Sequence, residues 1–226
     1  MNEKQDLLQM LGQVAVFSAL SEEDLRHIAQ TCVLHTYSAG EMVFFEKDEI
    51  ASVLVVYAGD VAVFKRAADG REQILSHLRA GEIVSVVPLV LHQNACHAAS
   101  GRAATTTQIL SITPRLFEAL CAKNAAFNRT LLEHLAGKLE QLSELAASLS
   151  LQSARSRLAA FLIKHADQPR QSAGITQEEI AAEIGTVREI VARLLRDFSQ
   201  LGWLKRERQR LILINKAALE EEARRW

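Results

Sequence analysis

Short β-branched and aromatic runs alternate with glycine-containing turns over residues 36–112, and this alternation restricts the fold more than any other feature of the chain. Gly40, Gly59, Gly70 and Gly81 mark the turns. Many short strands at regular spacing predict an antiparallel β-barrel or jelly roll, since the strands of a parallel sheet need long crossovers between them. The runs expected to form strands are Met42–Phe45, Val53–Tyr57, Val61–Lys65, Gln73–Leu78, Ile83–Val87 and Gln108–Ile112.

Helical patterns flank this predicted barrel on both sides. Residues 1–35 are predicted to be helical, and Ser21 is expected to cap a helix whose first turn is acidic. Pro114 begins a second helical region, which breaks near Asn124 and continues to about residue 150. The chain therefore combines a β-rich part with long helices, and its expected fold class is α+β.

Leucines recur every seven residues along the second helical region, as in a coiled-coil seam. The predicted seam consists of Leu131, Leu135, Leu142, Leu145 and Leu149. Such a seam predicts a homodimer in which Leu132 and Leu139, off the seam, pack on the barrel. The alternative is a core helix that packs only on the barrel of its own chain.

A two-helix unit is predicted over Ile175–Arg196, with a hinge at Gly185. The first helix is expected to end at Gly185, because glycine adopts the left-handed conformation at little cost. Thr186 is then expected to cap the second helix. The apolar stripes that hold the two helices together are predicted to be Ile180 and Ile184 on the first, and Ile190, Leu194 and Leu195 on the second.

The polar side of the second predicted helix carries Arg188, Glu189 and Arg193. A compact helix pair with a basic, hydrogen-bonding outer face suits the major groove of DNA. Residues 202–214 then predict two short strands joined by a basic turn, which would form a hairpin wing. Together with a helix at 152–165, these elements predict a winged helix-turn-helix, followed by a helical and peripheral tail over 216–226.

Composition limits the classes of protein to which this chain can belong. After residue 150 there are 14 Lys and Arg against 10 Asp and Glu, whereas the preceding part has 12 against 17. A slightly basic C-terminal part is typical of a small nucleic-acid-binding domain. The 3 cysteines lie far apart, so neither a disulfide framework nor a zinc ribbon is expected. No apolar run is long enough to cross a bilayer, and we expect a cytoplasmic protein with no membrane partner.

Three segments, taken in order, resemble the CRP/FNR family of bacterial transcription regulators: Val53–Lys65, Asp69–Leu78 and Ile175–Leu195. The resemblance implies a sensor jelly-roll barrel with N-terminal helices over residues 1–123, a dimerisation helix over 124–150 and a winged helix-turn-helix over 151–226. It also implies a homodimer that binds double-stranded DNA and responds to an effector. RNA polymerase is a further candidate partner, and no enzymatic activity is expected.

The second helix of the pair resembles the base-reading helix of the cyclic-AMP-responsive members, with Arg188, Glu189 and Arg193 as the reading residues. An arginine fork matches guanine O6 and N7, and a carboxylate accepts a hydrogen bond from cytosine N4. The resemblance implies a half-site close to TGTGA. Two alternatives stay open: Glu189 would form a capping box with Thr186, or Arg193 would contact only phosphate.

Other polar residues around this helix pair are candidates for phosphate contacts. These candidates are Thr176, Gln177, Thr186, Lys205, Arg206 and Arg208. Phosphate contacts add affinity but carry no sequence information. For the basic residues of the wing, a merely solvated turn is the alternative.

The predicted ligand site departs from that of the cyclic-nucleotide-binding members. Ser85 and Val86 stand where those members have Gly-Glu, and Cys96-His97-Ala98 stands where they have Arg-Ser. The cationic partner of a phosphate is therefore missing, and cyclic AMP is not the expected effector. An iron–sulfur cluster is not expected either, because it needs four thiolates and the chain has 3 cysteines.

An apolar stretch remains as the candidate effector pocket. Its residues are Val84, Val86, Val87, Leu89, Leu91, His92, Cys96 and His97. In one interpretation the stretch binds haem or a small apolar effector, with a histidine as axial ligand. In the other, the valines simply fill the barrel and the histidines lie on the surface. Carbon-monoxide-sensing haem members place their ligands where this chain has Ser85 and Val87, so that ligation pattern is not carried over.

Two further classes of protein compete with an effector-responsive regulator. One is a ligand-independent regulator whose barrel is only structural. The other is a cupin-type metal enzyme fused to a helix-turn-helix, which the sequence disfavours because it lacks the close His-x-His pair of such enzymes.

Overall fold

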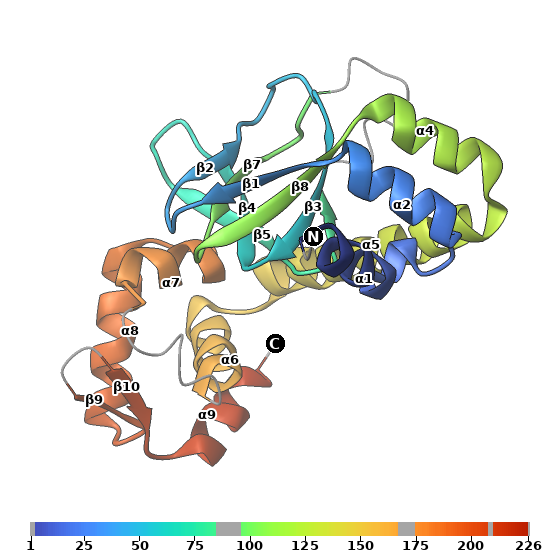
Figure 1. Cartoon of the computed structure of the whole chain (residues 1–226). Helices are drawn as coiled ribbons and strands as arrows, with labels where there is room; N and C mark the ends of the chain where they lie inside the picture. The colour runs from blue at the N-terminus through green and yellow to red at the C-terminus, as the bar shows by residue number, and fades with distance from the viewer. Residues whose placement is uncertain (1–2, 85–95, 167–174, 208–209, 226) are drawn as a thin grey trace. The chain divides into compact units, whose positions relative to one another are not determined.

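Residues 3–84, 96–166, 175–207 and 210–225 are described by a computed structural model, which divides into two units (Figure 1). The first unit comprises Met1–Lys65 and Ser76–Gln141, and the second comprises Arg66–Leu75 and Leu142–Trp226.

The first unit is built on two four-stranded antiparallel sheets, ordered β1-β8-β3-β6 and β2-β7-β4-β5. Their strands are β1 (Val33–Tyr37), β2 (Met42–Phe44), β3 (Val53–Ala58), β4 (Asp60–Arg66), β5 (Glu72–Arg79), β6 (Ile83–Val84), β7 (Ser100–Ala103) and β8 (Thr107–Ile112). The last residue of β4 and residues 72–75 of β5 belong to the second unit. This arrangement confirms the predicted α+β class with a β-rich N-terminal part. Strands β1 and β7 were not among the predicted strands.

Strand β3 is apolar along its length because both of its faces are buried. Val53 and Val55 pack into one hydrophobic cluster, while Leu54 and Val56 pack into another. Successive side chains of a strand point to opposite faces, so both faces of this sheet are covered. Leu110 of β8, which pairs with Val55, belongs to the same cluster as Val55.

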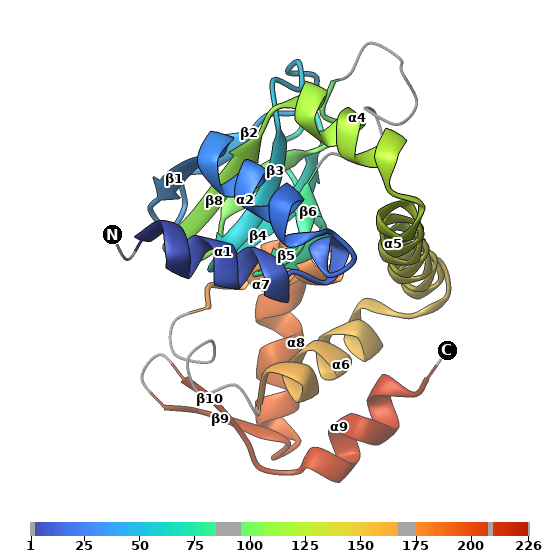
Figure 2. The ribbon, with the colours of Figure 1, turned by 45° about the vertical axis from the view of Figure 1, so that its right-hand side comes forward.

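Helices cover the Val53 and Val55 face of this sheet (Figure 2). They are α1 (Glu3–Gln13), η1 (Ala15–Phe17), α2 (Glu22–Thr31), α4 (Pro114–Lys123) and α5 (Ala125–Leu151). Phe127 lies at their meeting point, with ring centroids 6.1 Å from Phe17 and 5.7 Å from Phe117. The Ser21 cap is confirmed by a 3.1 Å hydrogen bond from the Asp24 amide. The expected helical region of residues 1–35 ends earlier, because Val33 already begins β1.

The predicted seam of α5 is wrong at its first two positions. Leu131 is 5% exposed and Leu135 is partly buried, and both pack against the barrel cluster that contains Phe127. By contrast, Leu132 and Leu139 are 66% and 67% exposed. The helix carries two apolar stripes of the same period, and the barrel covers the one that begins at Phe127.

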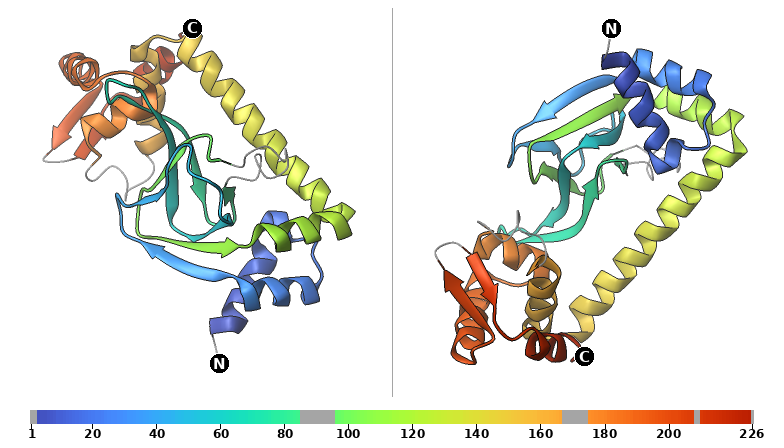
Figure 3. Two further views of the ribbon diagram at one scale, coloured as in Figure 1. Left: turned by 90° about the horizontal axis from the view of Figure 1, so that it is seen from above. Right: turned by 60° about the horizontal axis from the view of Figure 1, so that its bottom comes forward.

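Besides the end of α5 and the start of β5, the described residues of the second unit form four helices and a hairpin: α6 (Ala154–Ala166), α7 (Gln177–Ile184), α8 (Arg188–Gln200), β9 (Leu204–Glu207), β10 (Arg210–Leu213) and α9 (Lys216–Ala223). β9 and β10 pair antiparallel, which confirms the predicted wing. α6 and α9 lie side by side (Figure 3). The tail is not peripheral as predicted, because Leu219 of α9 is fully buried in the core of this unit.

None of the helices in the described ranges is both long enough and apolar enough to span a membrane.

Candidate nucleic-acid interface and ligand region

The turn between α7 and α8 is closed by Gly185, as predicted. Gly185 has φ 66° and ψ 52°, the left-handed conformation that a side chain would strain. The amides of Gly185 and Thr186 both donate to the Ala181 carbonyl oxygen, with an N–O distance of 3.0 Å for Thr186. The last turn of α7 is therefore satisfied by main-chain groups, and the chain is redirected into α8.

The prediction that Thr186 caps α8 is wrong. The N-cap is Val187, whose hydrocarbon side chain has no acceptor for a capping hydrogen bond. Thr186 lies one residue too early, because its amide closes α7 and α8 begins only at Arg188. The proposed capping box of Thr186 with Glu189 is therefore absent. Nothing in the cap competes for the Glu189 carboxylate, which favours the other interpretation of that residue.

A capping box does occur at the start of α7. The Glu179 amide donates to Thr176 Oγ1 at 3.1 Å, and the Thr176 amide donates to Glu179 Oε2 at 2.6 Å. Thr176 is exposed and Gln177, the first residue of α7, is half-buried. The box fixes the N-terminus of α7, which is the positive end of the helix. Phosphate groups of DNA are favourable ligands at such an end.

Helix α8 separates an apolar face from a charged face. Val191, Leu194 and Phe198 are buried in the core of the second unit. The three predicted base-reading residues, Arg188, Glu189 and Arg193, are all exposed on this helix. The packing of the apolar face thus fixes which side chains α8 offers to a partner.

Arg188 has a partner within the helix pair. Its Nε lies 3.0 Å from Glu178 Oε1 on α7, and the two side chains are 61% and 62% exposed. An ion pair this open to solvent contributes little free energy, about 0–1 kcal/mol. The pair orients Arg188 without holding it firmly.

Arg196 is an exposed residue of α8 to which sequence reasoning assigned no role. It lies three positions after Arg193, so the two side chains are neighbours on the helix surface. Its Nε donates to the Ala192 carbonyl oxygen at 3.2 Å, which leaves the rest of the guanidinium pointing away from the core. The signal available in the sequence was the repeat of basic residues along one helix face.

The candidate phosphate contacts of the wing are described only in part. Lys205 of β9 is exposed, and its Nζ lies 2.8 Å from Glu207 Oε1. The Glu207 carboxylate raises the pKa of Lys205 through a hydrogen bond and its charge. The side chain of Arg206 and the whole of Arg208 lie outside the described residues.

The candidate effector pocket is also described only at its ends. Val84 is 3% exposed and shares a cluster with Phe44. His97 is buried and stacks on Phe44, with ring centroids 4.4 Å apart. Cys96 is half-buried and pairs through a β-bridge with Glu49. Val86, Val87, Leu89, Leu91 and His92 lie outside the described residues.

Burial also lowers the pKa of His97, with an opposing contribution from Asp48. The imidazole is therefore neutral at pH 7 and supplies no positive charge to its surroundings. Within the described ranges, no group of three or more His, Cys, Asp or Glu side chains is placed to hold a metal ion.

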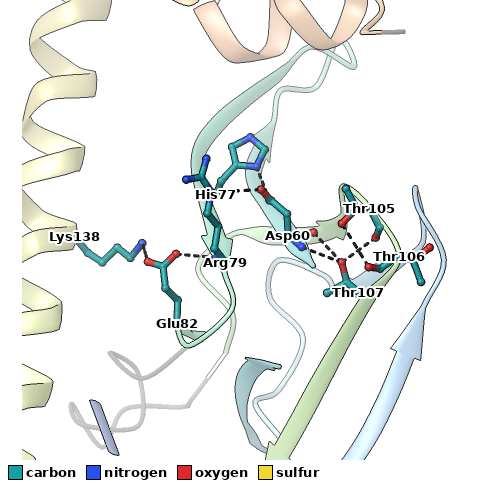
Figure 4. A network of polar contacts seen from close by, with 8 residues as sticks. All are labelled: Asp60, His77, Arg79, Glu82, Thr105, Thr106, Thr107 and Lys138. Atoms are coloured by element: carbon teal, nitrogen blue, oxygen red, sulfur yellow. Dashed lines mark hydrogen bonds and ion pairs between the residues drawn. The ribbon is translucent and has the colours of Figure 1, made fainter. Parts of the chain in front are cut away.

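A network of polar contacts in the first unit connects α5 with residues near the end of β5 (Figure 4). Lys138 of α5 forms an ion pair with the Glu82 carboxylate, which also accepts a 2.7 Å hydrogen bond from the Arg79 amide. Next to it, His77 Nδ1 lies 2.6 Å from Oδ1 of Asp60, a residue that is only 7% exposed. Helix α5 is thus tied by charge to the turn that precedes the candidate pocket.

His134, one turn before Lys138, reinforces this connection. It makes a hydrogen bond with the main chain of Ile83. Burial and the charge of Lys138 lower the pKa of His134, while Glu82 and the Ile83 hydrogen bond oppose the shift. Two successive turns of α5 therefore contact the segment at Glu82 and Ile83.

Comparisons with known proteins agree with both parts of this description. Residues 34–124 match the family described as cyclic nucleotide-binding domain, and residues 156–222 match the Crp-like helix-turn-helix domain. The CRP-like cAMP-activated global transcriptional regulator of Mycobacterium tuberculosis is 23% identical over 224 residues, which are 96% of this chain and 99% of the relative.

Solved structures share the fold over most of the chain. A regulator assigned to the Crp/Fnr family from Eubacterium rectale has a TM-score of 0.79 at 19% identity, covering 92% of this chain and 97% of its own. The c-di-GMP responsive global regulator CLP of Xanthomonas campestris has a TM-score of 0.75 at 18% identity, covering 85% and 99%.

Proposed function

The chain belongs to the CRP/FNR family of DNA-binding transcription regulators, and we propose that it acts as an effector-responsive homodimer on a palindromic operator with TGTGA-like half-sites. The single observation that carries this proposal is the exposure of Arg188, Glu189 and Arg193 on α8, directly after the Gly185 turn. The relatives named above respond to different nucleotides by name, so family membership does not identify the effector.

The proposed roles of the reading residues follow from their chemistry. Arg188, at the first position of α8, donates two hydrogen bonds to a guanine edge in the major groove. Glu189, which no capping box occupies, accepts a hydrogen bond from a cytosine amino group. Arg193 reads the base nearer the centre of the operator, while Arg196 binds phosphate on its flank.

The proposed dimer seam uses the exposed face of α5 rather than the face that packs on the barrel. Leu132 and Leu139 are its large apolar members. Together with Ala136, Ser143 and Ala146, these leucines follow one another at intervals of four, three, four and three residues. This is the spacing of a coiled-coil seam. Small residues between the leucines let the two helices approach closely.

The proposed effector is a small molecule without a phosphodiester. This part of the proposal is supported by the neutral, buried His97 at the position where the related sites have an arginine. Val84 and Phe44 share a buried apolar cluster and His97 stacks on Phe44, so the described end of the candidate stretch is apolar with one polar ring. Haem and small aromatic molecules are both largely apolar ligands that suit such a site.

A selection experiment tests the DNA-binding proposal. Full-length protein is used to recover duplexes from a random pool, and the recovered sequences are read. We expect inverted repeats with guanine at the position that faces Arg188, spaced by one helical turn. Recovery of single, unrepeated sites would contradict the dimer, and recovery of unrelated sequences would contradict the assigned half-site.

An absorption spectrum and a thermal shift test the effector proposal. A Soret band in the purified or reconstituted protein would identify haem. Addition of cyclic AMP is expected to leave the melting temperature unchanged, because the sequence of residues 81–98 contains no arginine or lysine to bind its phosphate. A clear stabilisation by cyclic AMP would contradict the proposed class of effector.

A further inference from the structure

Arg157, near the start of α6, donates hydrogen bonds to the ends of two other helices. Its Nη1 lies 2.5 Å from the Gln152 carbonyl oxygen and, at a longer 3.5 Å, near that of Ser148. On its other side, Nε lies 2.6 Å from the Ile184 carbonyl oxygen and Nη2 lies 3.3 Å from that of Gly185. One guanidinium thus joins the end of α5 to the end of α7.

The chemistry of these acceptors explains why an arginine is present. The last carbonyl groups of a helix have no partner within the helix, and they form its negative end. In the described part of the chain, all four hydrogen-bond acceptors of Arg157 are main-chain oxygens at helix ends, and the Ser148 oxygen also accepts from the Gln152 amide. Burial lowers the pKa of Arg157, but an arginine stays charged at neutral pH. The planar fork of donors reaches two separate acceptor sites, which a lysine ammonium cannot do.

The same two helix ends also meet through apolar contact. A Cβ atom on Gly185 would collide with Leu149 Cδ2 and with Gln73 Oε1, so α5 runs close against the turn at this point, beside the Gln73 side chain. Two residues after Gly185, Val187 begins α8 as its N-cap. The direction in which α5 ends and the direction in which α8 begins are therefore set at one joint, and Arg157 is the charged group that donates hydrogen bonds to both helix ends there.

We propose that Arg157 is the positioning residue that fixes the recognition helix α8 relative to the end of α5, and that it thereby sets the half-site spacing which the dimer accepts. This inference rests on the proposed dimeric DNA reader for its spacing consequence. Its structural consequence, an ordered joint at residues 148–157 and 184–187, does not depend on the operator.

Amide hydrogen exchange of the full-length protein tests the joint directly. In Arg157→Met, we expect the amides of Gln152, Gly185 and Thr186 to exchange about 10-fold faster or more. The carbonyl groups at these two helix ends lose the guanidinium that donates to them, so the helix ends open more often. The amides of Val191–Phe198 are expected to keep their protection. Arg157→Lys is expected to restore part of the protection, since it keeps the charge but contacts only one helix end.

Arg155→Met provides the matched control. Arg155 is also an arginine of α6, but its guanidinium lies over the rings of Phe198 and Trp203 in the core. Its removal is expected to accelerate exchange at Val191–Phe198. Wild-type exchange at the joint in Arg157→Met, or a uniform acceleration in which both variants behave alike, would overturn the proposed positioning role.

Operator spacing tests the functional consequence. The affinity of wild type and of Arg157→Met is measured on an inverted TGTGA repeat and on the same repeat with one extra central base pair. We expect wild type to lose at least about 10-fold on the longer operator, and the variant to lose clearly less while it still prefers TGTGA. An unchanged spacing preference would refute the positioning role. Failure of wild type to bind any TGTGA repeat would refute the proposed operator, and amide exchange would still decide the role of Arg157.

Discussion

Glu178 Oε1 lies 3.0 Å from Nε of Arg188, so the arginine proposed to read guanine is paired with a carboxylate of the preceding helix. Both side chains are more than half exposed, and such a pair has a free energy of about 0–1 kcal/mol. DNA can therefore displace Glu178 from Arg188 at little cost. The carboxylate itself stays close to the interface, where it repels phosphate groups.

Removal of that carboxylate is expected to strengthen binding to all DNA. We expect Glu178→Gln to bind both the operator and random duplexes about 2- to 10-fold more tightly, because one repulsive charge is lost. Fluorescence anisotropy at two salt concentrations measures this. Glu221→Gln is the control, since it removes the same charge from an exposed residue of α9. Equal gains in the two variants would show that only net charge matters.

Arg188 and Arg196 are expected to differ in what they contribute. Arg188→Ala should cost about 1–3 kcal/mol on the operator and relax the preference at one base pair, because a bidentate base contact is lost. Arg196→Ala should weaken the operator and a scrambled duplex alike, as expected for a phosphate contact. Titration of both duplexes with both variants measures the difference. If Arg188→Ala loses the same free energy on the scrambled duplex, its base-reading role is refuted.

The two apolar stripes of α5 predict opposite consequences for matched substitutions. Leu139→Glu should produce folded monomers, because it places a charge in the proposed seam. Leu131→Ala should leave the dimer intact but lower the free energy of unfolding by about 2–4 kcal/mol, because Leu131 is buried against the barrel. Analytical ultracentrifugation and chemical denaturation distinguish the two. A dimeric Leu139→Glu variant would remove this face from the proposed interface.

The stability of the first unit is expected to fall as the pH is lowered through the ordinary histidine range. Burial lowers the pKa of His97 and of His134 below the unfolded value of about 6.5. The unfolded chain therefore binds more protons in this range, so the histidines' contribution is complete above pH 6.5 and is lost below it. Denaturant unfolding between pH 5 and pH 8 measures the effect.

A single substitution tests whether His134 contributes to this pH dependence of stability. His134→Gln keeps a hydrogen-bonding side chain beside Ile83 but cannot titrate, and it should flatten the pH dependence. His27→Gln, at an exposed position of α2, is the control for the substitution itself. A pH profile that is identical in wild type and His134→Gln would contradict the assignment.

Local sequence signals predicted the elements whose structure depends on local chemistry. The Gly185 turn followed from the freedom of glycine, and the strand run Val53–Val56 followed from its apolar content. Strand β7 was missed because Ser100–Ala103 has a composition with little strand preference, and its pairing with β2 and β4 is what makes it a strand.

Long-range packing explains the predictions that failed. Heptad spacing identified an apolar stripe on α5 but not which of its two stripes the barrel covers, so Leu131 and Leu135 were placed on the wrong face. Thr186 has a side chain suitable for a cap, yet its amide closes α7 instead. The four-carbonyl contact of Arg157 joins segments far apart in sequence, and nothing local marks it.

Sequence-specific DNA binding is the central claim, and a competition assay tests it most directly. The full-length protein is bound to a labelled inverted TGTGA repeat, with and without a small-molecule extract of bacterial cells, and is displaced by the unlabelled repeat or by a scrambled duplex of the same composition. We predict that the repeat competes at least about 1,000-fold better than the scrambled duplex in one of these conditions. Equal competition by the two duplexes in both conditions would contradict the account.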